Sequence, residues 1–491
     1  MNSYIGDEAV IRYCENEILP AYDEAQKQRD AQYTVWSARA VYDHAVGSLS
    51  WEASCAKHLK ECRKALHLTD TTPPTPPPIP ASGRMRMAGR ICGDDHGPMN
   101  ALGTTLFWGL WGFKHDRARL QLHFDWASQR NIKFFRMLGE VRDVNPNLPP
   151  FWRDQAIVPV GSPGYPEWPD YEEMVAGCTQ MAMDYGMRIE WSIFGTGYDD
   201  KARTVRRFLD GIKPVMSGVQ MIEPANENNG FSGASGVTEM RQLASVIRRE
   251  VGRDFPLALT AISLDPAIVH PLYDGSAANL FTLHFERDLA ENGWRPVRQV
   301  WGGKDFGPFC NNEPVGPGSS MNSEDDAERL VFGQLNAWLT GACMSVIHAG
   351  AGVRGVVDPA RGRAANLWEV PALEPTLRAL QTIVPLLPPD LAQWTKENFY
   401  WAGHPFEMEG LVGDAALDAN HGCVRCFAAH SGGQFVVAPF GIMQDFAMKA
   451  RSAMQVRCYD WTGNLYDQRS LAAGERLTVS GRRSALVLGT R

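Results

Sequence analysis

The sequence predicts an α/β protein with a (β/α)8 barrel at its centre, a helical module before the barrel and a small β-sandwich after it. Between about residues 83 and 395, apolar strand-like runs alternate with amphipathic helical stretches, which is typical of a parallel sheet with crossover helices. Eight such runs span about 245 residues, close to the roughly 250 residues of this barrel. An open doubly wound sheet is the alternative, but no Gly-rich phosphate loop follows the first strand.

The eight expected strands are short apolar runs that end in turn signals. Helical patterns such as HDRARLQLHFDWASQR and SEDDAERLVFGQLNAWLTG separate most of them, and Ser323 with Asp326 gives the second pattern a loose capping signal. In chain order, the expected strands lie near Thr105, Phe135, Trp191, Ile222, Leu259, Thr282, Phe309 and Val346.

A proline-rich stretch marks the clearest domain boundary. Residues 71–80, TTPPTPPPIP, contain six prolines, which exclude a helix or a central strand and favour an extended polyproline spacer. At roughly 3.1 Å per residue, this spacer would be about 30 Å long. The predicted domains are therefore a helical module at 1–70, a linker at 71–82, the barrel at 83–395 and the β-sandwich at 396–491.

The helical module carries an apolar stripe, because Ile11, Cys14, Ile18 and Tyr22 recur at helical spacing. This stripe is either a face for self-association or for docking to a larger assembly, or the core of an internal helical hairpin. The sequence leaves both interpretations open.

The last 95 residues or so show a different pattern. Short alternating runs such as QFVVAPF and MQVRCYDW are separated by turn signals such as SGG and WTGN. This pattern predicts the short antiparallel strands of a sandwich.

Composition excludes several classes of function. A formal net charge of -8 argues against a nucleic-acid partner, and the absence of an 18-residue apolar run argues against a membrane span. The first residues lack the apolar core of a secretory signal, and ten scattered cysteines suit synthesis in a reducing cytoplasm. Cys423 and Cys426 have no second pair and lie on a predicted strand, so we expect no metal site and no cofactor.

Two glutamates follow predicted strands in similar surroundings. The stretch IEPANENNG places Glu227 at the end of the fourth strand, and GPFCNNEPVGPG places Glu313 at the end of the seventh. The two are 86 residues apart, close to three strand–helix units of about 30 residues each. Strand ends meet at the functional face of a barrel, where a pair of carboxylates is what glycoside hydrolysis requires.

With these residues the sequence resembles the clan of retaining glycoside hydrolases that have a (β/α)8 barrel and catalytic glutamates after strands four and seven. The resemblance covers about residues 84–395. It implies that Glu227, in the motif ANE, is the general acid/base and that Asn226 binds a sugar 2-hydroxyl. It also implies that Glu313, in NNEP, is the nucleophile and that Arg136, in KFFRMLGE, supports it.

Two positions depart from this clan. A tryptophan often ends strand eight, where this chain has His348 in SVIHAGAG, and a tyrosine often follows strand six, where it has His284 in LHFERD. We include both histidines as candidate substrate-binding residues, while the sugar specificity stays open. Trp191, Trp301 and Trp108 are candidate platforms for sugar stacking, although packing is the commoner role in a chain with 15 tryptophans.

Each candidate also has an ordinary structural interpretation. Glu227 and Glu313 could be capping or solvated loop acids, Arg136 a salt-bridge partner and His284 a core histidine. Two other acids are rivals to the catalytic pair. We expect Glu223 to serve the barrel interior, because it lies earlier in its strand, and Glu286 to be a loop charge.

The predicted function is hydrolysis of O-glycosidic bonds in a polysaccharide or cell-surface glycan by double displacement, with carbohydrate as the partner. The alternative is a noncatalytic carbohydrate-binding or virion structural protein on the same scaffold. The helical module and its spacer resemble bacteriophage virion proteins that carry a glycan-degrading domain. That resemblance implies a virion-associated location, reached from the cytoplasm without a signal peptide. The sequence does not identify the sugar, the linkage, endo or exo cleavage, or the oligomeric state.

Overall fold

The computed structural model describes twelve stretches of the chain, all within the compact unit Pro78–Arg491. The predicted helical module at 1–70, residues 71–79 of the linker, and Cys423 and Glu286 lie outside the described residues. The described stretches are 80–142, 155–196, 200–227, 236–261, 265–285, 287–319, 322–353, 365–398, 402–409, 425–442, 446–479 and 484–491.

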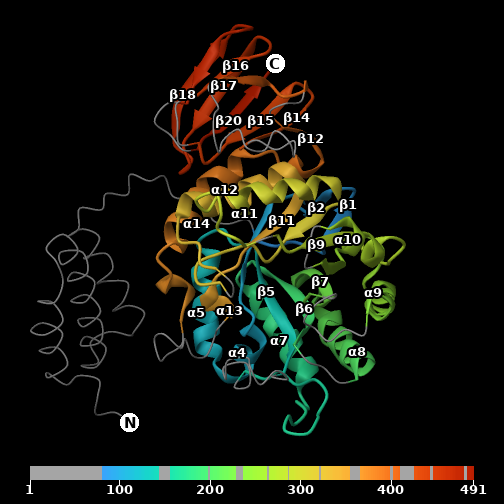
Figure 1. The fold of residues 1–491 in the computed structure, drawn as a ribbon. Coiled ribbons are helices and arrows are strands. Elements are labelled where there is room, and N and C mark those ends of the chain that lie inside the picture. The colour runs from blue at the N-terminus through green and yellow to red at the C-terminus, as the bar shows by residue number, and fades with distance from the viewer. Residues whose placement is uncertain are drawn as a thin grey trace, which may run out of the picture. The chain divides into compact units, whose positions relative to one another are not determined.

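The centre of this unit is an eight-stranded parallel sheet, as predicted (Figure 1). Its strands are hydrogen-bonded in the order β7-β6-β5-β4-β11-β10-β9-β8, so the first and last strands of the chain order, β4 and β11, are neighbours. A parallel bridge between Ile222 in β7 and Leu257, next to β8, brings the two edges together and nearly closes the barrel. The strands are β4 (Ala101–Thr105), β5 (Phe134–Val141), β6 (Arg188–Thr196), β7 (Val219–Ala225), β8 (Ala258–Ala261), β9 (Leu280–Leu283), β10 (Phe309–Asn311) and β11 (Ala342–Ile347).

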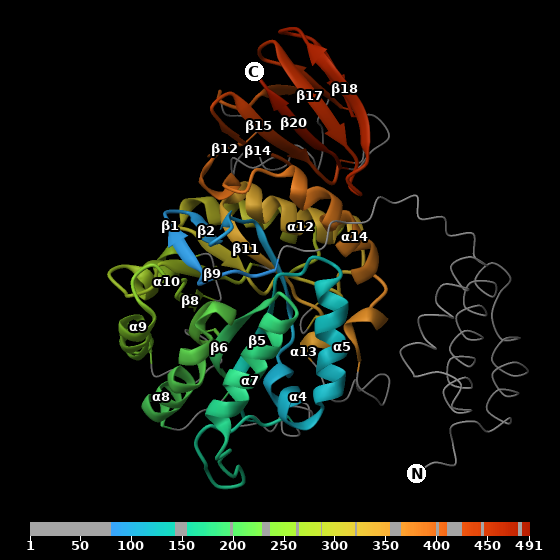
Figure 2. The same cartoon turned by 180° about the vertical axis from the view of Figure 1, so that it is seen from behind.

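Helices cover the outer side of this sheet (Figure 2), so the strands are buried on both faces and read as continuous apolar runs. In α12, Asp326 is the N-cap and accepts hydrogen bonds from the backbone of Glu328 and Arg329. The main helices are α4 (Gly109–His115), α5 (Arg117–Ser128), α7 (Tyr171–Asp184), α8 (Lys201–Ile212), α9 (Val237–Val251), α10 (Pro266–Tyr273), α11 (Arg295–Gln299), α12 (Ala327–Thr340), α13 (Gly350–Val353) and α14 (Leu373–Ile383). Short 3-10 helices are η3 (Lys213–Gly218), η4 (Val300–Asp305), η5 (Leu367–Glu369), η6 (Val384–Leu386) and η7 (Leu391–Gln393).

A three-stranded antiparallel sheet precedes the barrel and was not predicted. It consists of β1 (Arg86–Ala88), β2 (Ile91–Asp94) and β3 (Gly97–Pro98). Asp94 forms a buried ion pair of 2.7 Å with Arg188, the first residue of β6. Because Arg188 begins a barrel strand, this pair attaches the small sheet to the end of the barrel where the strands start.

The chain ends in two antiparallel sheets that pack face to face, which confirms the predicted β-sandwich. Between them lies a second apolar core that includes Phe406, Phe435 and Leu477. The strands are β12 (Thr395–Asn398), β13 (Phe406–Glu409), β14 (Cys426–Ser431), β15 (Gln434–Pro439), β16 (Ala447–Ala450), β17 (Met454–Tyr459), β18 (Leu465–Leu471), β19 (Arg476–Thr478) and β20 (Leu486–Thr490). Among the described helices of the whole chain, none is long and apolar enough to cross a membrane.

Candidate active site

Glu227 and Glu313 lie at the same end of the barrel, each two residues beyond its strand. The backbone N–H of Asn226 still donates to Phe194 of β6, at 2.8 Å, so β7 stays paired up to that residue. Glu227 then leaves the ladder with a φ of 47°, a left-handed conformation that is costly for a residue with a Cβ and tends to occur at functional sites. After β10, Pro314 cannot donate to a neighbouring strand, which ends the pairing beside Glu313.

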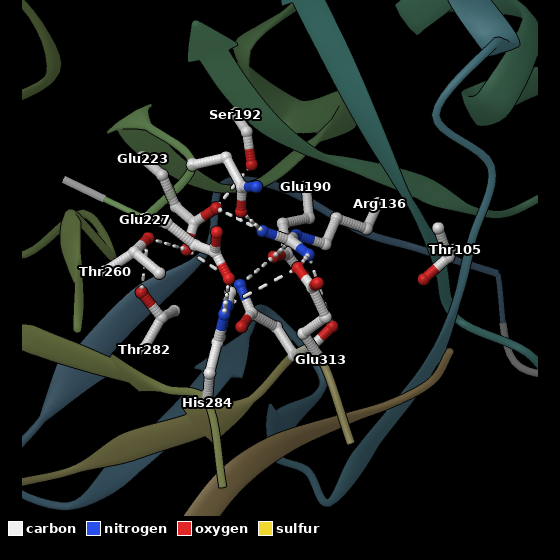
Figure 3. A network of polar contacts seen from close by, with 12 residues as sticks. Thr105, Arg136, Glu190, Ser192, Glu223, Glu227, Thr260, Thr282, His284 and Glu313 are labelled. Carbon is white, nitrogen blue, oxygen red and sulfur yellow. Dashed lines mark hydrogen bonds and ion pairs between the residues drawn. The ribbon is translucent and has the colours of Figure 1, made fainter. Parts of the chain in front are cut away.

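His284 lies between the two glutamates (Figure 3). Its Nδ1 is 3.1 Å from Oε1 of Glu227, and its Nε2 is 3.5 Å from Oε2 of Glu313. One ligand atom of each of the three side chains lies within 4.8 Å of the other two. The two carboxylates therefore face one space, with one imidazole in contact with both.

Arg136 holds the opposite side of Glu313. Its Nη1 donates to Oε2 of Glu313 at 2.7 Å, and its Nη2 donates to Oδ1 of Asn226 at 2.6 Å. The guanidinium is fully buried on β5 and also contacts Glu223 and Glu190, each at 3.3 Å. Burial alone would lower the pKa of Arg136, but the charges of these three glutamates outweigh it and raise the pKa.

Glu223 lies inside the barrel, below Glu227. Its carboxylate accepts hydrogen bonds from Ser192, from Thr260 at 2.7 Å and from the amide of Asn312 at 2.7 Å. Burial opposes ionisation, but the charge of Arg136 and the hydroxyl donors together lower the pKa of Glu223. Glu223 is thus an ionised partner of Arg136 in the interior and has no access to a substrate.

Glu190, on β6, completes this interior cluster and was not predicted. It accepts a hydrogen bond of 3.0 Å from the same amide of Asn312. Burial, with the nearby charge of Glu223, raises its pKa to about 8. The two interior carboxyl groups thus contact the same arginine but have pKa values that are shifted in opposite directions.

A second arginine, Arg287, contacts the free side of Glu313, where its Nη2 donates to Oε1 at 2.7 Å. Its side chain is 6% exposed, so water screens this pair little. Sequence analysis did not select Arg287. The available signal was a cation three residues after His284, just beyond the sixth strand, on the face where the glutamates were expected.

His348, the residue after β11, approaches the same oxygen of Glu313, with Nε2 at 3.9 Å. Its Nδ1 is 3.0 Å from the hydroxyl of Thr105. Burial lowers the pKa of His348 to about 3, so this imidazole is neutral near neutral pH. His348 therefore lies beside Glu313 without adding charge there.

The surrounding cations hold the pKa of Glu313 well below its usual range. Burial raises this pKa, but the positive charges of His284 and His348 when protonated, and those of Arg287 and Arg136, outweigh it. Because His348 is neutral near neutral pH, the two arginines supply the permanent part of this field. Glu313 is therefore a carboxylate, with one guanidinium on each of its oxygens.

The three candidate tryptophans do not form platforms for sugar stacking, because their indoles are packed in the protein interior. Trp191 is fully buried, with its N–H 3.3 Å from the Thr179 hydroxyl and its ring edge-on to Phe208 of α8. Trp301 lies 4.8 Å from the ring of Phe427, between the barrel and the sandwich.

Trp108 is only 1% exposed and lies under the guanidinium of Arg119. None of the three tryptophans offers a face to a sugar.

Glu227, His284 and Glu313 also have the donor types and spacing of a metal site. Both oxygens of Glu313, however, already accept hydrogen bonds from Arg136 and Arg287. A cation placed there would be repelled by two guanidinium groups. The donor set therefore does not fit a metal ion well.

Comparison with known proteins agrees with this architecture. No protein-family model matches the sequence, and no curated protein matches it. A solved structure described as a glycoside hydrolase aligns with a TM-score of 0.58 at 11% identity, over 83% of this chain and 97% of its own. A glycoside hydrolase family 5 protein from Bacteroides vulgatus ATCC 8482 aligns with a TM-score of 0.57 at 11% identity, over 83% and 93%. The chain has the fold of these glycoside hydrolases.

Proposed function

We propose that the protein is a retaining glycoside hydrolase, with Glu313 as nucleophile and Glu227 as general acid/base. The observation that carries this proposal is the closeness of the two glutamates, because one carboxyl oxygen of Glu227 lies within 4.8 Å of one carboxyl oxygen of Glu313. Retaining enzymes hold their carboxyl groups about 5–5.5 Å apart, whereas inverting enzymes need about 6.5–9.5 Å to admit a water molecule.

The different surroundings of the two glutamates support different roles. Glu313 is nearly buried and is held ionised by Arg136 and Arg287, as a nucleophile requires. The Glu227 side chain is 14% exposed, contacts His284 and stands at the mouth of the barrel, where a leaving group can depart into solvent. Such an asymmetry between paired carboxyl groups is the usual basis for assigning the acid and the base.

In the first step, an oxygen of Glu313 attacks the anomeric carbon while Glu227 gives its proton to the departing glycosidic oxygen. The C–O bond breaks, and a glycosyl ester forms on Glu313. In the second step, Glu227 takes a proton from water, the water oxygen attacks the anomeric carbon, and Glu313 leaves as a carboxylate.

His284 suits both steps because it touches both carboxyl groups. Before the first step, a neutral imidazole with its proton on Nε2 faces the charged Glu313 and accepts a hydrogen bond from protonated Glu227 at Nδ1. Once Glu313 is an ester and Glu227 is ionised, the tautomer with the proton on Nδ1 is the favoured one. Asn226 has its oxygen occupied by Arg136, which leaves its N–H groups to donate to a sugar hydroxyl.

The proposed substrate is an O-glycosidic bond in a polysaccharide or cell-surface glycan, and a virion-associated location stays a prediction. The test is a screen of the full chain against aryl glycosides and polysaccharides, followed by NMR of the first product from any substrate that is cleaved. We expect the anomer with retained configuration, and loss of turnover in Glu313→Gln. The exposed Glu407→Gln, on β13, is the matched control and should keep wild-type activity.

An inverted first product would refute the retaining assignment. Binding of glycans without any turnover by the wild-type protein would favour the noncatalytic alternative.

A further inference from the structure

An open groove of about 580 Å³ lies outside the candidate active site and has no role in the chemistry proposed above. Four of its eight lining residues carry an aromatic ring, and the others are Ala156, Val158, Gly164 and Pro166. Trp111 and His115 come from α4, while Tyr165, Pro166 and Trp168 come from the segment before α7. Trp111 and Tyr165 are partly exposed, so their rings contact solvent as well as the core.

The groove is on the same end of the barrel as the two glutamates. Helix α4 follows β4 after three residues, and Ile157 pairs with Val141, the last residue of β5, through two backbone hydrogen bonds of 2.9 and 3.1 Å. Both walls are therefore attached to the carboxyl ends of barrel strands, where Glu227 and Glu313 also lie. Figures 1 and 2 both place α4 and the segment before α7 at the end of the barrel away from the C-terminal sheets.

A short chain of contacts joins the groove to Glu313. His348 is 3.9 Å from Glu313, and its ring centroid is 5.8 Å from that of Phe107. Trp111, in α4, follows Phe107 by four residues. The groove is thus linked to Glu313 through Phe107 and His348, while none of the site residues lines it.

The chemistry of the lining is that of an uncharged aromatic surface. The rings lie at mutual angles, with His115 5.1 Å from Trp111 and 5.6 Å from Trp168. Among the described residues that line the groove, none is acidic. Lys114, next to His115, lies 4.7 Å over the Trp168 ring and is paired with Asp170. Burial, together with the charge of Lys114, lowers the pKa of His115 and favours its neutral form.

We propose that this groove is a binding subsite for a neutral pyranose unit of the glycan, separate from the site that holds the reacting sugar. The C–H face of a pyranose packs against an aromatic ring, and neither a charged sugar nor an acidic peptide finds a charge partner in this lining. The inference rests on the proposed function, because it takes the bond to be cleaved between Glu227 and Glu313. A sugar bound in this groove would make the length of the glycan a determinant of substrate preference.

The test compares Trp111→Ala and Tyr165→Ala with wild type on two substrates that carry the same reacting sugar, a short aryl glycoside and a long neutral oligosaccharide. Loss of one stacking contact should reduce kcat/KM on the oligosaccharide by roughly threefold to tenfold. The value for the aryl glycoside should stay unchanged. Trp111→Phe, which keeps an aromatic face, should recover most of the loss, and the exposed Leu465→Ala is the control.

Equal effects on the short and the long substrate would overturn the subsite and leave the proposed function standing. If the wild-type protein cleaves neither substrate, the proposed function fails, and calorimetric binding of the neutral oligosaccharide to wild type and Trp111→Ala becomes the measurement. Weaker binding to Trp111→Ala would support the groove without catalysis, and equal or absent binding would overturn it. If the melting temperature of Trp111→Ala is lower than that of wild type, Tyr165→Ala replaces it in the test. Tyr165 lies outside the helices, so its replacement does not change a helix.

Discussion

Replacement of Arg287 by Gln tests how the protein keeps Glu313, the proposed nucleophile, ionised. The guanidinium donates to Oε1 of Glu313 at 2.7 Å, and both side chains are nearly buried. A hydrogen bond to a charged group contributes about 1.5–3 kcal/mol. Since one pKa unit corresponds to about 1.4 kcal/mol, the pKa of Glu313 should rise by roughly one to two units in Arg287→Gln.

The assay is the pH dependence of kcat/KM on an activated aryl glycoside, which needs little help from the acid. Arg287 lowers the pKa of Glu313, and activity requires ionised Glu313, so activity is lost as the pH falls through that pKa. Removal of Arg287 should therefore move the acidic limb of the profile to higher pH by roughly one to two units. Arg287→Lys keeps the charge and should move the limb less.

Arg378→Gln is the matched control, because Arg378 pairs with Glu374 on the exposed side of α14. Its profile should overlay that of wild type. An acidic limb that stays in place in Arg287→Gln, with only kcat reduced, would show that Arg287 positions groups and does not set the charge of Glu313. A limb that moves to lower pH would contradict the electrostatic reasoning altogether.

Three further predictions concern the catalytic pair, the interior acid and the domain boundary. Azide should restore turnover of an aryl glycoside by Glu227→Ala, giving a glycosyl azide of retained configuration by NMR, whereas rescue of Glu313→Ala should give the inverted azide. The pKa of Glu190 is raised to about 8, so its own contribution to the stability of wild type falls as the pH rises from about 4.5 towards 8. Glu190→Gln lacks this contribution, so the urea midpoint of wild type should fall relative to that of the variant as the pH rises. A difference between the two midpoints that stays constant across that range would refute the assignment. Deletion of Met1–Pro77, the other compact unit of the chain, should leave the cooperative melt of the remainder intact, and aggregation of the shortened protein would count against separate domains.

The barrel could be predicted because each of its strands produces a local pattern in the sequence. Each strand buried on both faces is a continuous apolar run, and all eight expected strand positions lie within a barrel strand. The small sheet β1–β3 was missed because strands of two to four residues, separated by Gly89 and other turn residues, show no periodicity. The ion pair of Asp94 with Arg188, two residues far apart in sequence, attaches that sheet to the barrel.

The sequence by itself determined where Glu227, Asn226 and Glu313 would lie, because strand ends in a barrel share one face whatever the side chains around them do. Burial was decided only by the tertiary structure, which placed Trp191 and Trp301 in packed layers. A tryptophan in a core and a tryptophan in a binding site can have the same sequence neighbours, so the local sequence does not distinguish the two roles.

The pKa values of the buried carboxyl groups also depended on the tertiary structure. Glu190 and Glu223 are the same residue type on adjacent strands, β6 and β7, yet their pKa values move in opposite directions. Arg136 on β5 contacts both carboxyl groups at 3.3 Å, so the difference arises from the hydroxyl donors to Glu223, Ser192 on β6 and Thr260 on β8, which are more than 30 residues from it in sequence. Ionisation depends on distances of 3 Å or so between such groups, and only the folded chain sets those distances.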